Sequence, residues 1–118
     1  MISMREAYEK IGADYDGASV RLMGEEMLAR FALKFLDDEN MDKLEVAMAA
    51  GDAKEAFMAA HTLKGVSQNL GFDNLYKPAV VVTETLRGAD AVDGAREGMY
   101  ALQQQYAATM SALREAAE

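Results

Sequence analysis

The 118-residue sequence predicts an all-α fold, an antiparallel up-and-down four-helix bundle with a short N-terminal helical extension. Two observations lead to this prediction. Apolar residues recur every three or four positions over most of the chain, which is the period of an amphipathic helix. The one run that suits a strand, Val80 to Val82, has no second strand candidate with which to pair.

The N-terminal part of the chain has a weak pattern. We expect a turn or two of helix near Met4 to Tyr8 and a short helix capped by Asp16, after which Gly24 interrupts. The length suits one domain with one core. We therefore interpret residues 1–118 as a single domain, composed of an N-terminal extension (1–23) and a helical bundle (24–117).

The first helix of the bundle begins at Glu25, and its apolar pattern continues in register to Met48. Asp38 is the exception, because it stands where an apolar residue is expected. A long helix that is kinked or broken near residues 37–40 explains this pattern most simply. Gly51 then supplies a typical C-terminal stop.

The second helix spans about residues 52–70. Asp52 with Glu55 resembles a capping box at its start, and Gly71 is the expected stop. At about 100° per residue, one side of this helix carries an apolar seam within about 40° of a single line. The seam consists of Ala56, Ala59, Leu63, Val66 and Leu70.

Two further helices complete the prediction. The third, about residues 74–87 with Asp73 as its cap, contains Pro78, and a proline inside a helix costs about 3 kcal/mol. We therefore expect its regular part to start nearer Lys77 or to bend. The last helix has Asp90 as its expected cap. The apolar seams of these two helices are Leu75, Ala79, Val82 and Leu86, and then Val92, Ala95, Met99, Leu102, Tyr106, Met110 and Leu113.

Composition narrows the class of protein. The net charge of −8 argues against nucleic acid or an anionic membrane surface as the main partner. The chain has no cysteine, which fits a cytoplasmic protein, and its N-terminus shows neither a signal peptide nor a membrane span. We expect a small soluble domain.

His61, the only histidine, lies on the side of the second helix opposite the seam. Imidazole titrates near neutral pH, so its neutral, nucleophilic form is available there. Lys64 can place an ammonium near an anion, and Gln68 can donate a hydrogen bond. Gly65 should destabilise the helix by about 0.8–1 kcal/mol relative to alanine, and access for another molecule would compensate. Together these residues predict a site for a phosphoryl group carried on nitrogen.

Plainer interpretations exist for the same residues. A single histidine, like the exposed lysines Lys54 and Lys64, is most often an ordinary surface residue. Phe57 and Met58, which neighbour His61 on the helix, could pack under another helix or form an exposed docking patch. A di-metal bundle needs Glu-x-x-His motifs on two helices, whereas Met58 stands three residues before the only histidine. The sequence also lacks zinc-ligand spacing and a nucleotide-binding glycine-rich loop.

The segment Ala60-His61-Thr62-Leu63-Lys64-Gly65, followed by Asn69-Leu70-Gly71, resembles the signature of the histidine-containing phosphotransfer (HPt) domain of bacterial two-component phosphorelays. Phe35-Leu36-Asp37-Asp38, Leu44 and Ala49-Ala50-Gly51-Asp52 upstream, and Glu84-Thr85-Leu86-Arg87-Gly88 downstream, extend the resemblance to about residues 16–110.

This resemblance implies that His61 accepts a phosphoryl group, at Nε2, from a receiver-domain aspartate and passes it to another receiver aspartate. Lys64 would stabilise the phosphoryl charge, Gln68 would donate a hydrogen bond, and Gly65 would permit approach. Lys54, Phe57 and Met58 are the candidate partner-binding residues.

The same resemblance implies a monomer whose partners are receiver domains and a hybrid sensor histidine kinase. It implies no kinase activity, metal or cofactor of its own, with Mg²⁺ supplied by the receiver. Two alternatives stay open. The chain could be a non-catalytic helical adaptor that binds a response regulator, or a piece of a larger kinase, although Met1 and a self-contained set of helices favour a free-standing protein.

Overall fold

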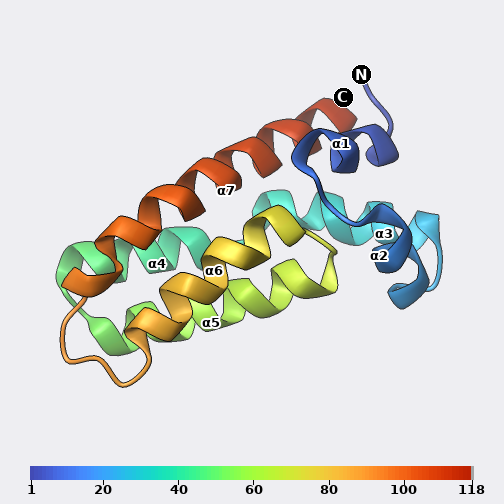
Figure 1. Cartoon of the computed structure of the whole chain (residues 1–118). Coiled ribbons are helices and arrows are strands. Elements are labelled where there is room, and N and C mark those ends of the chain that lie inside the picture. Colours follow the sequence, from blue (N-terminus) through green and yellow to red (C-terminus); the bar gives the residue numbers. More distant parts are fainter. Residues whose placement is uncertain (118) are drawn as a thin grey trace.

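The computed structural model describes residues 1–117, and this part of the chain consists of helices without a strand (Figure 1). The predicted all-α class is confirmed. The helices are α1 (Met4–Ile11), α2 (Tyr15–Arg21), α3 (Glu25–Lys34), the 3-10 turn η1 (Phe35–Asp37), α4 (Asn40–Ala50), α5 (Ala53–Asn69), α6 (Asp73–Leu86), the 3-10 turn η2 (Asp93–Ala95) and α7 (Arg96–Ala117).

The helices form an elongated molecule of 42 × 24 × 20 Å. Helix α5, which carries His61, packs against α4 on one side and α6 on the other, and α6 packs in turn against α7 (Figure 1). Helix α1 lies on α7 near the C-terminus of the chain. Within residues 1–117, no helix is long and apolar enough to cross a bilayer.

The break expected near residues 37–40 is present between α3 and α4. The chain tightens into η1 and then becomes extended at Asp38, with φ −67° and ψ 136°. The Asp38 side chain accepts a hydrogen bond from the backbone N–H of Asn40 at 3.1 Å. A polar residue suits position 38 because this residue lies between two helices and its side chain bonds to the start of α4.

Helix boundaries at two glycines agree with the sequence. Gly51 ends α4 in the left-handed conformation, with φ 72°. Asp52 caps α5 by accepting a hydrogen bond from the N–H of Glu55 at 3.1 Å. Gly71 follows the end of α5 with φ 73°. The stops and the start predicted around the histidine helix are thus confirmed.

Three predicted caps were wrong. Asp14, not Asp16, caps α2, because its carboxylate reaches the N–H of Gly17 at 3.0 Å. Asp73 lies inside the first turn of α6, where the helix dipole stabilises a negative charge, and Phe72 occupies the cap position. Asp90 precedes η2, whose tight turn delays the start of α7.

Pro78 lies inside α6 and does not delay its start, so of the two alternatives expected for this helix, a start nearer Lys77 or a bend, the first was wrong. Tertiary contacts stabilise the turn before the proline. The Asn74 side chain donates hydrogen bonds to Gln105 Oε1 at 2.9 Å and to Thr109 Oγ1 at 3.0 Å, and Leu75 is fully buried. These contacts compensate for the backbone bond that the proline ring removes.

An aromatic cluster joins the N-terminal helices to the rest of the core. Tyr8 of α1 is fully buried, with its ring centroid 5.3 Å from that of Phe72. Phe72 lies 5.3 Å from Phe35 of η1, which lies 6.0 Å from Tyr106 of α7. The N-terminal extension therefore contributes to the same core as the later helices.

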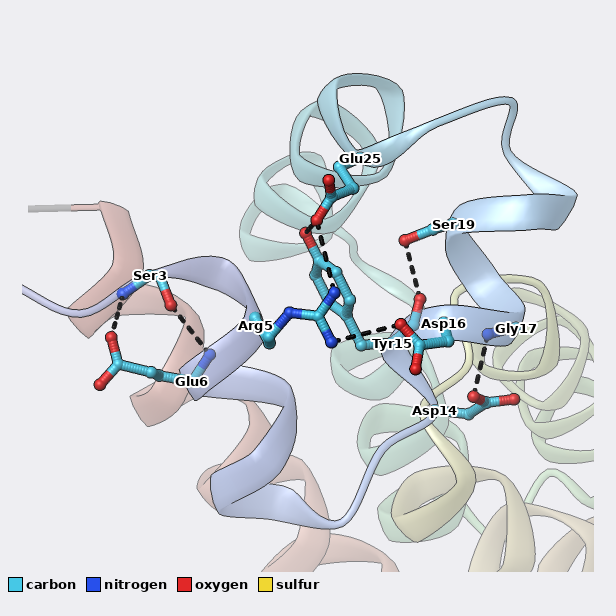
Figure 2. A network of polar contacts seen from close by, with 9 residues as sticks. All are labelled: Ser3, Arg5, Glu6, Asp14, Tyr15, Asp16, Gly17, Ser19 and Glu25. Atoms are coloured by element: carbon cyan, nitrogen blue, oxygen red, sulfur yellow. Dashed lines mark hydrogen bonds and ion pairs between the residues drawn. The ribbon is translucent and has the colours of Figure 1, made fainter.

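A polar network connects the first three helices on the surface. Figure 2 shows the guanidinium of Arg5 against the ring of Tyr15, at 4.4 Å from its centroid. Arg5 also pairs with Asp16 at 3.2 Å, and the Tyr15 hydroxyl donates to Glu25 at 2.8 Å (Figure 2). Side chains from α1, α2 and α3 thus meet at one point.

Candidate functional site

The inner face of α5 is composed mostly of alanine, which lets neighbouring helices approach closely. Four of the five predicted seam residues are buried: Ala56, Ala59 and Leu63 within α5, and Leu70 at its C-cap. Val66 is only half-buried. The buried set within the helix is Ala53, Ala56, Ala59, Ala60, Leu63 and Ser67. The side of α5 that is buried in the structure is therefore close to the side that the apolar seam predicts.

His61 is exposed on the outer face of α5, as the helical geometry predicts. Its ring is stacked on that of Phe57, one turn earlier, with centroids 5.7 Å apart and planes 18° apart. Within residues 1–117, no hydrogen bond or ion pair involves either ring nitrogen. Both nitrogens are thus available to an incoming molecule.

Space beside His61 is open at Gly65, one turn further along α5. A Cβ built at this glycine would meet nothing within 4 Å, so Gly65 does not serve close helix packing. Lys64 is half-buried, and no ion pair with the described part of the chain involves it. Gln68 is exposed. The cation, the gap and the amide predicted around His61 therefore share the outer face of the helix.

Two further residues belong to this site: Glu84, in α6, and Arg87, at the C-cap of α6. The guanidinium carbon of Arg87 lies 5.0 Å from the ring centroid of Phe57. Glu84 accepts two hydrogen bonds from Arg87, from Nε at 2.9 Å and from Nη2 at 3.2 Å. The bonds from Arg87, and more weakly the positive fields of Lys64 and His61, lower the pKa of the Glu84 carboxyl below its usual value.

Sequence reasoning did not place Glu84 and Arg87 in the site. The sequence analysis included these two residues only as part of a segment that resembles the family. Their spacing of three residues is a signal for an ion pair on one helix. The spacing does not show that this pair faces Phe57, because that contact depends on how α5 and α6 pack.

The three predicted partner-binding residues lie three and four positions apart on one side of α5 but differ in their surroundings. Phe57 is half-buried and lies toward Arg87 of α6. Met58 is 56% exposed and lines a groove of about 640 Å³ between α4 and α5. Lys54 is exposed in the first turn of α5. The groove is acidic as well as apolar, since its lining includes Glu39, Asp42, Asp52 and Glu55.

No group of three or more histidine, cysteine, aspartate or glutamate side chains comes together within residues 1–117 in a way that could bind a metal ion. The chemistry that the site itself offers is that of an exposed imidazole beside a lysine.

Comparison with known proteins identifies the class. A family model described as the Hpt domain matches residues 26–116, most of the chain, and the chain therefore belongs to the Hpt domain family. The resemblance carried by the segment around His61 is confirmed. Membership implies histidine phosphotransfer in two-component phosphorelays, in which such domains interact with receiver domains and kinases. Neither the curated proteins nor the solved structures gave a match.

Proposed function

We propose that this chain accepts a phosphoryl group from a receiver-domain aspartate onto His61 and passes it to a second receiver aspartate in a multistep relay. One observation carries this proposal. The only histidine of an Hpt domain stands exposed on α5, with both ring nitrogens free of hydrogen bonds to residues 1–117 and open space at Gly65.

The chemical step follows from these residues. A ring nitrogen of His61, Nε2 by family resemblance, attacks phosphorus in line, while the bond from phosphorus to the aspartyl oxygen breaks and the carboxylate leaves. The ammonium of Lys64 balances charge on the phosphoryl oxygens, and the amide of Gln68 donates to them. Transfer to the second receiver reverses these bond changes. Mg²⁺ would come from the receiver.

The remaining assignments belong to the same proposal. Lys54, Phe57 and Met58 contact the receiver, although Met58 does so from the α4 side of α5. The segment from α3 to α4, with α5, α6 and α7, makes up an antiparallel four-helix bundle within a single domain. The protein acts as a cytoplasmic monomer, receives its phosphoryl groups through a hybrid kinase, and has no kinase activity of its own.

A transfer assay tests the proposal. The protein is mixed with a receiver domain phosphorylated on aspartate, in the presence of Mg²⁺. We expect label on the protein that is labile in acid and stable in base, and none on His61→Gln. Arg96→Gln, a change at an exposed ion pair outside the site, is the matched control and should be labelled normally. Tight binding of receivers without any label would instead identify a non-catalytic adaptor.

A further inference from the structure

An attacking imidazole must present one nitrogen to the phosphorus, and most catalytic histidines are oriented by a hydrogen bond to the other nitrogen. His61 has no such bond within residues 1–117 and is exposed, so its two side-chain torsions are not fixed in that way. Its ring stacks on that of Phe57, with planes 18° apart.

Phe57 is itself constrained from a second helix. It is half-buried, and Arg87 lies over its ring at 5.0 Å. A guanidinium over an aromatic face is attracted by the ring quadrupole. Arg87 is in turn fixed by the two hydrogen bonds, 2.9 and 3.2 Å long, that Glu84 accepts from it. A planar group bonded at two points has little freedom to rotate away.

We propose that Phe57 and Arg87 are positioning residues for His61: Phe57 fixes the plane of the imidazole by stacking, and Arg87, bonded to Glu84, fixes the ring of Phe57. This inference rests on the proposed function for its biological role. Stacking orients the ring without using either nitrogen. One nitrogen therefore remains a nucleophile while the other can carry the proton.

The first test is spectroscopic and needs no partner. Because the chain has one histidine, its Hδ2 and Hε1 protons give one pair of imidazole NMR signals. We expect Phe57→Leu to move both signals, since it removes the ring current of the phenyl group, and Phe57→Tyr to retain them. Arg87→Gln should move them part of the way. Arg96→Gln is the matched control, because Arg96 pairs with Asp93 three residues away but lies outside the site.

The second test measures reactivity with potassium phosphoramidate, a small donor. Its phosphorus–nitrogen bond breaks, ammonia leaves, and a bond from phosphorus to His61 forms. We expect labelling of Phe57→Leu to be roughly three- to tenfold slower, the range that loss of an aromatic pair produces. Phe57→Tyr should restore the rate, Arg87→Gln should slow it by about twofold, and Arg96→Gln should leave it unchanged.

The outcomes separate the two proposals. Unchanged imidazole signals in Phe57→Leu, or an unchanged labelling rate in that variant, would overturn the positioning role. A labelling rate that falls equally in Phe57→Tyr would also overturn it, because this variant keeps the aromatic ring that the proposal requires. Labelling by phosphoramidate combined with failure of every phosphorylated receiver would overturn the relay and leave the positioning role intact.

Discussion

The C-terminal end of the histidine helix and its middle, around His61, differ in how their polar groups are used. At the C-terminal end of α5, backbone carbonyls accept hydrogen bonds from the N-terminal helices and their connection. The bonds are Tyr8 hydroxyl to Leu70 O at 2.7 Å, Arg21 Nη2 to Gln68 O at 3.1 Å, and Asp14 N–H to Gly71 O at 2.7 Å. Around His61, in contrast, the ring nitrogens have no partner within residues 1–117.

This difference shows how a rigid helix can carry an open site. A buried carbonyl left without a donor would cost about 1–3 kcal/mol. The hydrogen bonds to the carbonyls at the C-terminal end of α5 therefore stabilise the helix. On the outer face, His61 and Lys64 can then stay without a hydrogen-bond or ion-pair partner among residues 1–117, because the position of α5 does not depend on them. The predictions below test each half of this comparison, beginning with the fixed end.

Gly71→Ala should have the largest effect. Gly71 has φ +73°, and a Cβ there would lie 2.5 Å from the backbone oxygen of Asp14 and 2.9 Å from the Cβ of Ala18. Strain and overpacking together should lower the free energy of unfolding by about 2–5 kcal/mol, measured by urea denaturation. Gly88→Ala is the matched control, with φ +66° but nothing within 4 Å, and should lose only about 1–2 kcal/mol. Equal losses would show that the contact with Asp14 is unimportant.

Tyr8→Phe should destabilise the same end by about 1–3 kcal/mol, because the buried carbonyl of Leu70 loses its donor. Thermal or urea denaturation measures this loss. Tyr100→Phe, at a position 72% exposed, should change stability little. A loss as small as that of the control would contradict the role given to the Tyr8 hydroxyl.

The same variant has a pH signature. Burial raises the pKa of the Tyr8 phenol far above its usual value. The unfolded chain loses this proton near pH about 10, whereas the folded chain keeps it. The stability that the neutral phenol contributes is therefore intact below pH about 10 and falls as the pH rises further. The stability difference between wild type and Tyr8→Phe should narrow in that range.

Gly65→Ala tests the open face and should separate stability from function. With nothing within 4 Å of the added methyl group, the helix should gain about 0.5–1 kcal/mol in urea denaturation. Transfer from a phosphorylated receiver should slow by roughly ten- to a hundredfold, because the approach to His61 is displaced. Labelling by phosphoramidate, a much smaller donor, should slow less. A variant that is both more stable and fully active would show that the gap has no role in approach.

Arg87→Gln should have the smallest effect of these variants, and besides its modest influence on the His61 ring it should change the titration of Glu84. Hydrogen bonds from Arg87 lower the pKa of this carboxyl, so the pair is intact above the ordinary glutamate range and is lost as the pH falls through the lowered value. NMR titration of the Glu84 carboxyl carbon should show the pKa return toward its usual value in Arg87→Gln. Arg96→Gln should leave it in place, and a shift of the same size in that control would contradict the assignment.

Helical periodicity was sufficient for much of the fold and for one face of the site. His61, Lys64, Gly65 and Gln68 lie on the outer side of α5 because their angular positions follow from sequence spacing alone. The break around Asp38 followed from one misplaced charge in a regular pattern.

Features that depend on packing between helices could not be predicted in this way. The contact of Arg87 with Phe57 requires the relative position of α5 and α6, which no local pattern encodes. The caps Asp14 and Asp16 are equivalent as residue types, and only backbone geometry selects between them. Tyr8 belongs to a short helix whose weak pattern conceals its contact with Leu70, 62 residues away in sequence.

The burial of Tyr8 has a consequence for transplanting this domain. The segment matched by the family begins at residue 26, yet the Tyr8 phenol fills the space beside Phe72 and bonds to Leu70. A chimera built from the matched residues alone would leave an aromatic surface and a carbonyl facing water at the C-terminal end of the reactive helix. The unit that can be moved intact into another protein therefore starts before α1.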